Sequence, residues 1–328
     1  MVITITCDAD MPKCLNTPTK QAKKAKLLAE LHSGIPAKKA SGPGIQGFFS
    51  RTMIVTLKNK EELVIQFRPE PLDIEPFKVA RESLGAVVPT IELLEDDELK
   101  SEGIWTYCMN RLPGEPWLRA GGKRLPIVRS LARILSKGWV KDGGGDVVEN
   151  KLRPHLELLL SSPPETATPY KDVARDLLGK LEQLKRLPLF ISHYDLNEVN
   201  ILVRDGEVSG LVDWEFSSPL PFGVGFGRIH TLAGEFSQGE FYMPDDFVET
   251  ETAFWQEVFD GVPAEVKVVL DANVDAIQTA VTLGKLLEVF ELMDGEIGSG
   301  GAASLKALPK FLSYRIPAIR GSDPPYAK

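Results

Sequence analysis

The sequence predicts an α+β fold, with a small β-rich lobe followed by a larger and mostly helical lobe. Two observations predict it. Short apolar runs bounded by turn signals lie between residues 51 and 109, and longer segments with helical periodicity follow residue 120. The length of 328 residues is enough for two lobes, and a hydrophobic content of 43% is ordinary for a globular protein.

We expect three parts along the chain: an N-terminal extension with a basic helix at residues 1–40, an N-lobe at 41–110 and a C-lobe at 111–328. The extension includes a helical segment from Thr19 to Leu31. Its lysines could attract an anionic partner, although a charge run is usually a solvated face. These lysines are Lys20, Lys23, Lys24 and Lys26.

The N-lobe begins with a predicted β-hairpin, in which T-M-I-V-T-L forms one strand and Glu61 to Arg68 forms the other. A glycine-bearing loop precedes the first strand and contains Gly44, Gly47 and Ser50. Such a loop could present backbone N–H groups to phosphates, where a Cβ would block the approach. Gly-Pro-Gly also marks any exposed turn, so both interpretations stay open.

The most informative segment of the C-lobe is H-Y-D-L-N-E-V-N, from His193 to Asn200. A short apolar run, Leu189 to Ile191, is predicted to be a strand that delivers this segment onto a loop. A second motif, L-V-D-W-E, follows and places a carboxylate at Asp213. The two motifs put two aspartates and one asparagine on short connections between apolar runs.

A hairpin is predicted between these motifs, because Asp205-Gly206 is a strong two-residue turn signal. Its first strand follows Asn200 at once, and Val208 to Val212 forms the returning strand. Asp213 is therefore expected to emerge near Asn200.

The residue types suit the transfer of a phosphoryl group from a nucleotide. One carboxylate, at Asp195, would orient an attacking hydroxyl and accept its proton. An amide oxygen at Asn200 and a carboxylate at Asp213 are hard ligands suited to Mg²⁺. The alternative is that these residues simply cap turns, which we consider weaker for three residues at this spacing.

The H-x-D-x-x-x-x-N spacing followed by V-D-W-E resembles the catalytic core of the aminoglycoside phosphotransferase family, the small-molecule branch of the protein-kinase-like fold. A protein kinase would typically show H-R-D and D-F-G at these places. This chain has Tyr194 and Trp214-Glu215 instead. The resemblance covers roughly Ser41 to Phe290.

This resemblance implies a bilobal protein-kinase-like fold and transfer of the γ-phosphoryl group of ATP (or GTP) to a hydroxyl of a small molecule, assisted by Mg²⁺. It implies that Asp195 is the catalytic base and that Asn200 and Asp213 hold the metal. His193 would be structural and hold the loop in shape. Glu215 could reach a second metal or the substrate.

The resemblance also implies a lysine on the third strand of the N-lobe, paired with a glutamate on the next helix. Here the strand reads V-I-Q-F-R, so either Gln66 or Arg68 would take the place of the lysine. Glu75 lies near the position of the helix carboxylate, or is a plain helix cap. The adenine would meet the backbone of roughly Met109 to Arg111.

The segment Ser217 to Arg228 is rich in glycine and proline. Gly225 and Gly227 could mimic a phosphate loop, but we expect a flexible connection there. The resembling family often has an Asp just after this stretch, but this chain reads G-F-G-R-I-H. Further helices are expected in the C-lobe at Leu125–Val140, Asn150–Leu160, Tyr170–Leu187 and Ala264–Leu292.

A net charge of −8 argues against a broad nucleic-acid surface. No apolar stretch approaches the length of a membrane span. The first residues lack the pattern of a secretory signal, so we expect a cytoplasmic protein whose partner is a small-molecule hydroxyl acceptor.

Two other functions compete with a small-molecule kinase. A nucleotide-binding pseudokinase serving as an interaction module is favoured by the missing strand lysine. A protein kinase is disfavoured by Tyr194, by Trp214-Glu215 and by the lack of an A-P-E segment after Asp213.

Overall fold

A computed structural model describes residues 3–317, and the chain forms two compact units. The N-terminal unit takes in the chain up to Arg81 and also Ala86–Pro113. The C-terminal unit takes in Glu82–Gly85 and the chain from Gly114 onward. Each unit is described by itself below.

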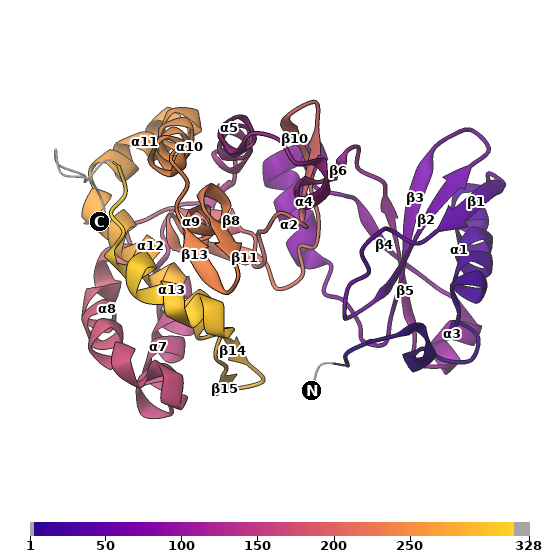
Figure 1. The fold of residues 1–328 in the computed structure, drawn as a ribbon, viewed down its shortest axis with the longest axis horizontal. Helices are drawn as coiled ribbons and strands as arrows, with labels where there is room; N and C mark the ends of the chain where they lie inside the picture. The colour runs from indigo at the N-terminus through magenta and orange to yellow at the C-terminus, as the bar shows by residue number, and fades with distance from the viewer. Residues whose placement is uncertain (1–2, 318–328) are drawn as a thin grey trace. The chain divides into compact units, whose positions relative to one another are not determined.

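The N-terminal unit is built on one antiparallel sheet of five strands in the order β1-β2-β3-β5-β4 (Figure 1). The strands are β1 (Ala37–Ser41), β2 (Arg51–Leu57), β3 (Glu62–Arg68), β4 (Ile91–Leu94) and β5 (Trp105–Asn110). The helical elements of this part are η1 (Asp8–Asp10), α1 (Pro18–Ser33) and α3 (Asp97–Ser101). Two further elements, α2 (Glu75–Leu84) and η2 (Gly85–Val87), are divided between the units, because Glu82–Gly85 belongs to the C-terminal unit.

Helix α1 covers one face of this sheet (Figure 1). The alternating burial along β2 explains the packing, because every second residue points to the same face. Ala25, Leu28 and Ala29 of α1 are buried in one apolar cluster with Met53 and Phe67 of the sheet. By the same period of two, Gln66 and Arg68 lie on the opposite face of β3 from Phe67.

The C-terminal unit is mostly helical and contains two sheets of three strands, in the orders β10-β9-β6 and β11-β8-β7, and two short hairpins. The strands are β6 (Glu115–Pro116), β7 (Trp139–Lys141), β8 (Leu189–Ser192), β9 (Ile201–Arg204), β10 (Glu207–Leu211), β11 (Ser218–Pro221), β12 (Glu235–Ser237), β13 (Glu240–Tyr242), β14 (Leu292–Met293) and β15 (Glu296–Ile297). The helices are α4 (Trp117–Ala120), α5 (Arg124–Leu135), α6 (Gly145–Val147), η3 (Val148–Leu152), α7 (Arg153–Ser161), η4 (Glu165–Tyr170), α8 (Lys171–Leu184), η5 (Val224–Phe226), α9 (Ile229–Ala233), α10 (Phe247–Gly261), α11 (Ala264–Asp271), α12 (Val274–Val289) and α13 (Ala302–Ser313).

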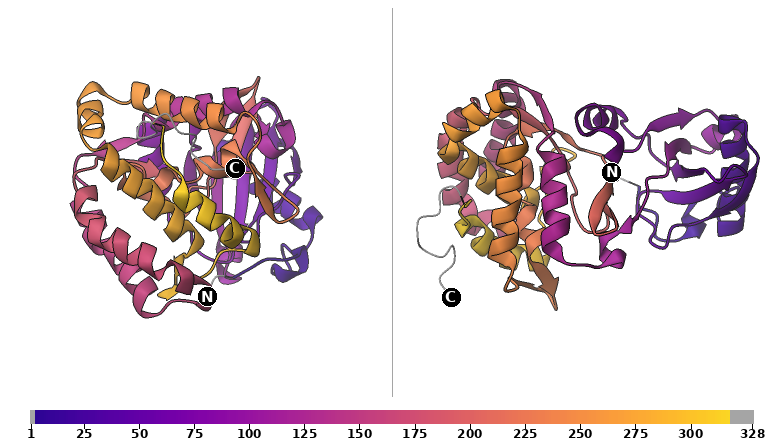
Figure 2. Two further views of the ribbon diagram at one scale, coloured as in Figure 1. Left: turned by 60° about the vertical axis from the view of Figure 1, so that its left-hand side comes forward. Right: turned by 90° about the horizontal axis from the view of Figure 1, so that it is seen from above.

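The helices of this unit pack on one another: α10 lies on α5, and α12 lies on α8 and α13. Figure 2 shows them together in two further views, coloured from magenta to yellow. Edge-to-face aromatic contacts fill the core between β8, η5 and α10. The rings belong to Phe190, Phe222, Phe226, Phe254 and Trp255.

The predicted fold class is confirmed: a sheet-based N-terminal part precedes a mostly helical C-terminal part. One predicted helix is too long. The segment Leu125–Val140 was expected to be helical throughout, but α5 ends at Leu135 and Trp139–Lys141 forms strand β7. The carbonyl of Gly138 accepts the N–H of Ile191 at 2.8 Å, so the chain leaves the helix to pair with β8.

Among residues 3–317, none of the helices combines the length and the apolar character that crossing a membrane requires.

Close backbone packing ties α12 to the glycine-rich turn η5. A Cβ built on Gly284 of α12 would lie 1.8 Å from the carbonyl oxygen of Val224. Real Cβ atoms do not approach so closely, and a backbone atom cannot rotate away. Only glycine fits at position 284 of this interface.

We expect Gly284→Ala to lower the free energy of unfolding by at least about 2 kcal/mol, because overpacking forces the backbone to shift. Gly179→Ala in α8 is the matched control, since a Cβ there meets nothing within 4 Å. The control should raise stability by about 0.5–1 kcal/mol through helix propensity alone. Denaturant unfolding of both variants measures these changes in stability. Equal midpoints would contradict the close packing of α12 on η5.

Candidate active site

The first candidate residues follow β8, a fully buried strand of the C-terminal unit. Strand β8 lies between β7 and β11, so both of its edges are paired. The chain leaves β8 at Ser192 and turns at once through His193 to Asp195. His193 is buried, whereas the side chain of Asp195 keeps 49% of its surface exposed. A rigid strand therefore presents a solvent-accessible carboxylate on a short loop.

The predicted hairpin between the two motifs is present. Asp205 and Gly206 both have positive φ, 54° and 81°, as a two-residue hairpin turn of type I′ requires. Strands β9 and β10 pair from Arg204↔Glu207 to Ile201↔Leu211, with one irregularity in the register. Beyond the last pair, the N–H of Val212 donates to the carbonyl of Asn200 at 3.0 Å. The backbone thus brings the residue before Asp213 beside Asn200.

Asn200 binds the catalytic candidate directly. Its Nδ2 donates to the carbonyl oxygen of Asp195 at 2.8 Å and to Oδ2 of the same residue at 3.3 Å. Asn197 caps the turn instead, since its Oδ1 accepts the N–H groups of Val199 and Asn200 at 2.8 and 3.3 Å. The turn-capping alternative therefore describes Asn197 better than Asn200.

This donor set is chemically suited to a magnesium ion. The two bonds to Asp195 use the amide nitrogen of Asn200, so the amide oxygen takes no part in them. Asp213 is exposed and has a positive φ of 66°. Within residues 3–317, no three His, Cys, Asp or Glu side chains are grouped as a metal site. One carboxylate and one amide are nevertheless typical protein ligands of Mg²⁺, which otherwise binds water and phosphate oxygens.

The side chain of His193 is buried and hydrogen-bonded, and is not exposed to solvent. Its Nε2 donates to the carbonyl of Val212 at 2.8 Å, and its ring lies 4.6 Å from that of Trp214. Burial lowers the pKa of His193 from 6.5 to about 4, because the charged form loses its hydration. A neutral His193 that links the two motifs fits a structural part better than a proton shuttle.

The strand candidates of the N-terminal unit differ in exposure. The Nε2 of Gln66 donates to Oγ of Ser50 at 3.0 Å, which joins two of the predicted phosphate-binding residues. Gln66 is partly exposed, whereas Arg68 keeps only 5% of its surface exposed. Gly44 and Gly47 lie exposed in the loop between β1 and β2.

The remaining candidates of this unit have partners of their own. Glu75 begins α2 and pairs with Lys78 one turn later, and its N–H donates to Oδ1 of Asp73 at 3.0 Å. Met109 lies in β5, opposite residues of both β3 and β4. The N–H of Arg111 donates to the carbonyl of Glu62 at 3.1 Å, so this group is engaged within the unit.

Arg228 is a residue that the motifs did not assign to the site. One of its Nη atoms lies 3.8 Å from Oδ1 of Asp195, and the other lies 3.1 Å from Oε1 of Glu288. The one signal in the sequence was Arg228 just after the glycine-rich run, where the resembling family often has an Asp. Nothing in the sequence placed it beside Asp195.

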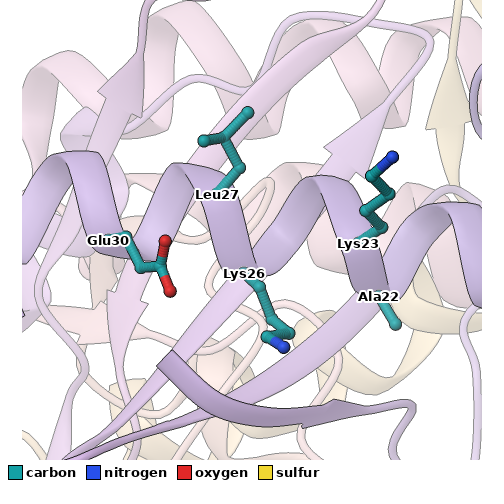
Figure 3. Close-up of a pocket in the computed structure, with 5 residues that line it drawn as sticks. All are labelled: Ala22, Lys23, Lys26, Leu27 and Glu30. Atoms are coloured by element: carbon teal, nitrogen blue, oxygen red, sulfur yellow. The ribbon is translucent and has the colours of Figure 1, made fainter. Parts of the chain in front are cut away.

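The lysines of α1 do not form one basic surface. Lys24 pairs with Asp96 and Glu98, both at 2.8 Å, and Lys20 donates to Oδ1 of Asn16 at 2.8 Å. Lys23 and Lys26 line a pocket at α1 (Figure 3), together with Ala22, Leu27 and Glu30. Surface lysines of one helix are usually solvated.

Stability should decrease on acidification as a result of His193. Because its folded-state pKa of about 4 lies below the ordinary 6.5, the unfolded chain binds more protons between these pH values. The contribution of neutral His193 is therefore full above pH 6.5 and falls, by up to about 3 kcal/mol, as the pH decreases to 4.

Urea melts from pH 7.5 to 4 test this expectation with His193→Gln, which keeps a donor for Val212. The wild type should lose stability faster than this variant as the pH falls. His32→Gln, at an exposed position of α1, is the control and should follow the wild type. Parallel curves for His193→Gln and the wild type would contradict the assignment.

Comparison with known proteins gives the chain a family. The sequence model of the phosphotransferase enzyme family matches residues 45–244, more than half of the chain. No curated protein matches the sequence. Among solved structures, a macrolide 2′-phosphotransferase from Brachybacterium faecium superposes with a TM-score of 0.52 and 15% identity, covering 87% of this chain and 96% of that one. A thermostable aminoglycoside phosphotransferase mutant, in a ternary complex with ADP and hygromycin B, gives 0.51 and 11%, covering 81% and 98%.

Another thermostable aminoglycoside phosphotransferase mutant, in a ternary complex with AMP-PNP and hygromycin B, gives a TM-score of 0.50 at 12% identity and covers 81% of this chain and 98% of its own. Identities this low speak to the fold alone, and that fold is the protein-kinase-like fold of phosphotransferases. The predicted resemblance and enzyme class are confirmed by the family match. The chain belongs to the phosphotransferase enzyme family.

Proposed function

We propose that this phosphotransferase moves the γ-phosphoryl group of ATP (or GTP) to a hydroxyl of a small molecule, with Asp195 as the base. The observation that carries the proposal is the bond pattern around Asp195. Asn200 binds both the backbone and the carboxylate of Asp195, while the β9–β10 hairpin brings the chain before Asp213 to Asn200. The proposed base and metal ligands therefore lie on one stretch of backbone, from Asp195 to Asp213.

Asp195 suits the part of base by its position. Its Oδ2 accepts a bond from Asn200, and about half of its side-chain surface faces solvent, where an acceptor hydroxyl can reach it. A carboxylate in this position orients the hydroxyl and takes its proton as the bond to phosphorus forms. Transfer then depends mainly on positioning, since little covalent chemistry falls to the protein.

Asn200 and Asp213 would hold the magnesium ion, which neutralises phosphate charge when it is bound. Glu215, two residues after Asp213, stays a candidate for a second metal or for the substrate. His193 would keep the two motifs together through Val212 and Trp214. A proton relay through His193 is not needed for the reaction.

We assign the grip on the nucleotide phosphates to Gln66 with Ser50, and we keep Arg68 as the second candidate. Gln66 is favoured because it is partly exposed and already hydrogen-bonded to Ser50. Arg68 carries the permanent charge, but it is almost fully buried. Gly44 and Gly47 remain candidates for backbone contacts to phosphate, Glu75 for support of the strand residue, and Met109 to Arg111 for the adenine.

The acceptor is proposed as a hydroxylated small molecule. The solved relatives are named as macrolide and aminoglycoside phosphotransferases, and hygromycin B is bound in two of them. In this chain the exposed rings of Tyr194 and Phe216 form a T-shaped pair, 5.7 Å apart, beside the base. Aromatic faces of this kind suit the apolar side of a ring-containing acceptor.

Asp195→Asn should lower kcat for phosphoryl transfer by about 10²–10⁴-fold, because the base is lost while the shape of the side chain is kept. The measurement is ADP release with MgATP or MgGTP over a panel of hydroxylated metabolites and peptides. Asp205→Asn is the matched control, since Asn also adopts the positive φ of the hairpin turn and should leave kcat unchanged.

Three outcomes separate the competing functions. Small-molecule turnover that Asp195→Asn abolishes supports the proposal, whereas transfer to peptides alone favours a protein kinase. Nucleotide binding with no turnover for any acceptor favours a pseudokinase. Turnover that persists in Asp213→Asn would remove the metal assignment.

Gln66→Ala should raise the Kd of MgATP by about 5–10-fold, because a hydrogen-bonding partner of the phosphates is lost. Titration calorimetry with MgATP measures this change. Thr52→Ala is the control: Thr52 pairs with Gln66 in the sheet register but has no assigned part in binding.

Arg68→Gln distinguishes the second candidate. If Gln66 grips the nucleotide, Arg68→Gln should lower the melting temperature, because it alters a buried charge, and leave the affinity of the folded protein within about twofold. An affinity loss in Arg68→Gln, with Gln66→Ala unchanged, would transfer the assignment to Arg68.

A further inference from the structure

Arg228 connects the catalytic loop to a helix that lies far away in the sequence. One Nη atom lies 3.8 Å from Oδ1 of Asp195 and within 3.5 Å of the carbonyl oxygen of Tyr194. The guanidinium therefore faces both the carboxylate and the backbone of the segment that carries the proposed base. Its side chain is only 21% exposed.

The other side of the guanidinium is anchored on α12. The second Nη atom lies 3.1 Å from Oε1 of Glu288, and the same oxygen accepts Nζ of Lys285 at 2.8 Å. Lys285 keeps 2% of its surface exposed and lies over the ring of Phe311 at 4.3 Å. Glu288 therefore pairs with both Lys285 and Arg228, and the buried Lys285 helps to fix the carboxylate to which Arg228 binds.

The backbone just before Arg228 is closely packed against other elements of the unit. A Cβ built on Gly225 would lie 2.0 Å from Oγ of Ser192, the last residue of β8. A Cβ on Gly227 would lie 3.3 Å from the backbone nitrogen of Lys285. The glycine-rich run was expected to be a flexible connection, but here it packs directly on β8 and α12. The packing of this run on β8 and α12 therefore determines where the backbone of Arg228 lies.

We infer that Arg228 is a positioning residue for phosphoryl transfer, which holds the Tyr194–Asp195 segment so that the Asp195 carboxylate faces the acceptor hydroxyl. The inference rests on the proposed function, in which Asp195 is the base. Asn200 holds Asp195 through Oδ2 and Arg228 faces Oδ1, so the two partners act on different oxygens of one carboxylate. Together they restrict its rotation.

The effect of Arg228 on the rate should come from positioning Asp195 more than from the strength of the ion pair between them. A partly exposed pair at 3.8 Å contributes little to stability, because water and ions screen it. A small displacement of a reacting group can nevertheless reduce a rate by about 10²-fold. The effect of Arg228 should therefore be seen in kcat and in the order of the loop, more than in the melting temperature.

Arg133 of α5 is the control because it also lies between two carboxylates, with a side chain that is 48% exposed compared with 21% for Arg228. Its Nη atoms lie 3.1 Å from Oε1 of Glu207 and 3.8 Å from Oε1 of Glu257, which are the two distances found at Arg228. Neither glutamate belongs to the proposed site. Both substitutions remove an arginine that lies between two carboxylates, but only Arg228→Gln removes a contact with the proposed base. Comparing them therefore isolates the effect of that contact.

The first experiment needs no turnover. Hydrogen–deuterium exchange of the full-length protein should show faster exchange of the peptide that covers Tyr194–Asn200 in Arg228→Gln than in the wild type, by at least about threefold. Arg133→Gln should leave this peptide unchanged, and the melting temperatures of both variants report any general loss of structure. Unchanged exchange in Arg228→Gln would overturn the inference, whatever the enzyme does.

The second experiment measures ADP release from MgATP with the acceptor found by the panel. Arg228→Gln should lower kcat about 10–100-fold and leave KM for MgATP within about threefold. Arg228→Lys keeps the charge but lacks the planar fork, so it should recover only part of the loss. In an Asp195→Asn background, Arg228→Gln should add less than about twofold, because the basic carboxylate that Arg228 positions is already lost.

The outcomes separate this inference from the proposed function. If Asp195→Asn leaves transfer unchanged, the base assignment fails and the exchange data alone decide whether Arg228 orders the loop. If Asp195→Asn abolishes transfer while Arg228→Gln behaves like Arg133→Gln, only the part assigned to Arg228 fails. Full additivity of the two substitutions would likewise assign Arg228 to general stability.

Discussion

The candidate site depends on a two-residue turn. Asp205 and Gly206 adopt positive φ, which reverses the chain tightly enough for β9 and β10 to pair up to Ile201 and Leu211. The N–H of Val212 donates to the carbonyl of Asn200 beyond the last strand pair, and His193 donates to the Val212 carbonyl. The turn therefore brings the two motifs together.

Beside this hairpin, three polar side chains of the loop make different contacts. Asn197 closes the turn, Asn200 binds the backbone and the carboxylate of Asp195, and His193 bonds across to the second motif. Burial lowers the pKa of His193 to about 4, so the neutral ring links the two motifs without adding a charge near Asp195. The half-exposed carboxylate of Asp195 is thus contacted by Asn200 through Oδ2 and faced by Arg228 through Oδ1.

Glycine has two distinct uses in the C-terminal unit. At Gly206 it supplies a backbone conformation that other residues rarely adopt. At Gly225 and Gly284 it supplies space, because a Cβ would collide with Ser192 or with the carbonyl of Val224. The run around Gly225 therefore packs between β8 and α12, and this packing places Arg228 beside the loop that contains Asp195.

The sequence by itself determined the fold class, the β9–β10 hairpin and the spacing of Asp195, Asn200 and Asp213. These features are local: turn residues, strand period and motif spacing act within a few residues of one another. The end of α5 at Leu135 could not be read this way, because Trp139 and Val140 fit helical and strand patterns equally until β8 offers a partner.

Only the tertiary structure placed Arg228 between Asp195 and Glu288, which are 93 residues apart in the chain, and joined Gln66 to Ser50. Such contacts follow from which helices and strands pack together. That packing is decided by the fit of whole surfaces, so no short stretch of sequence encodes it.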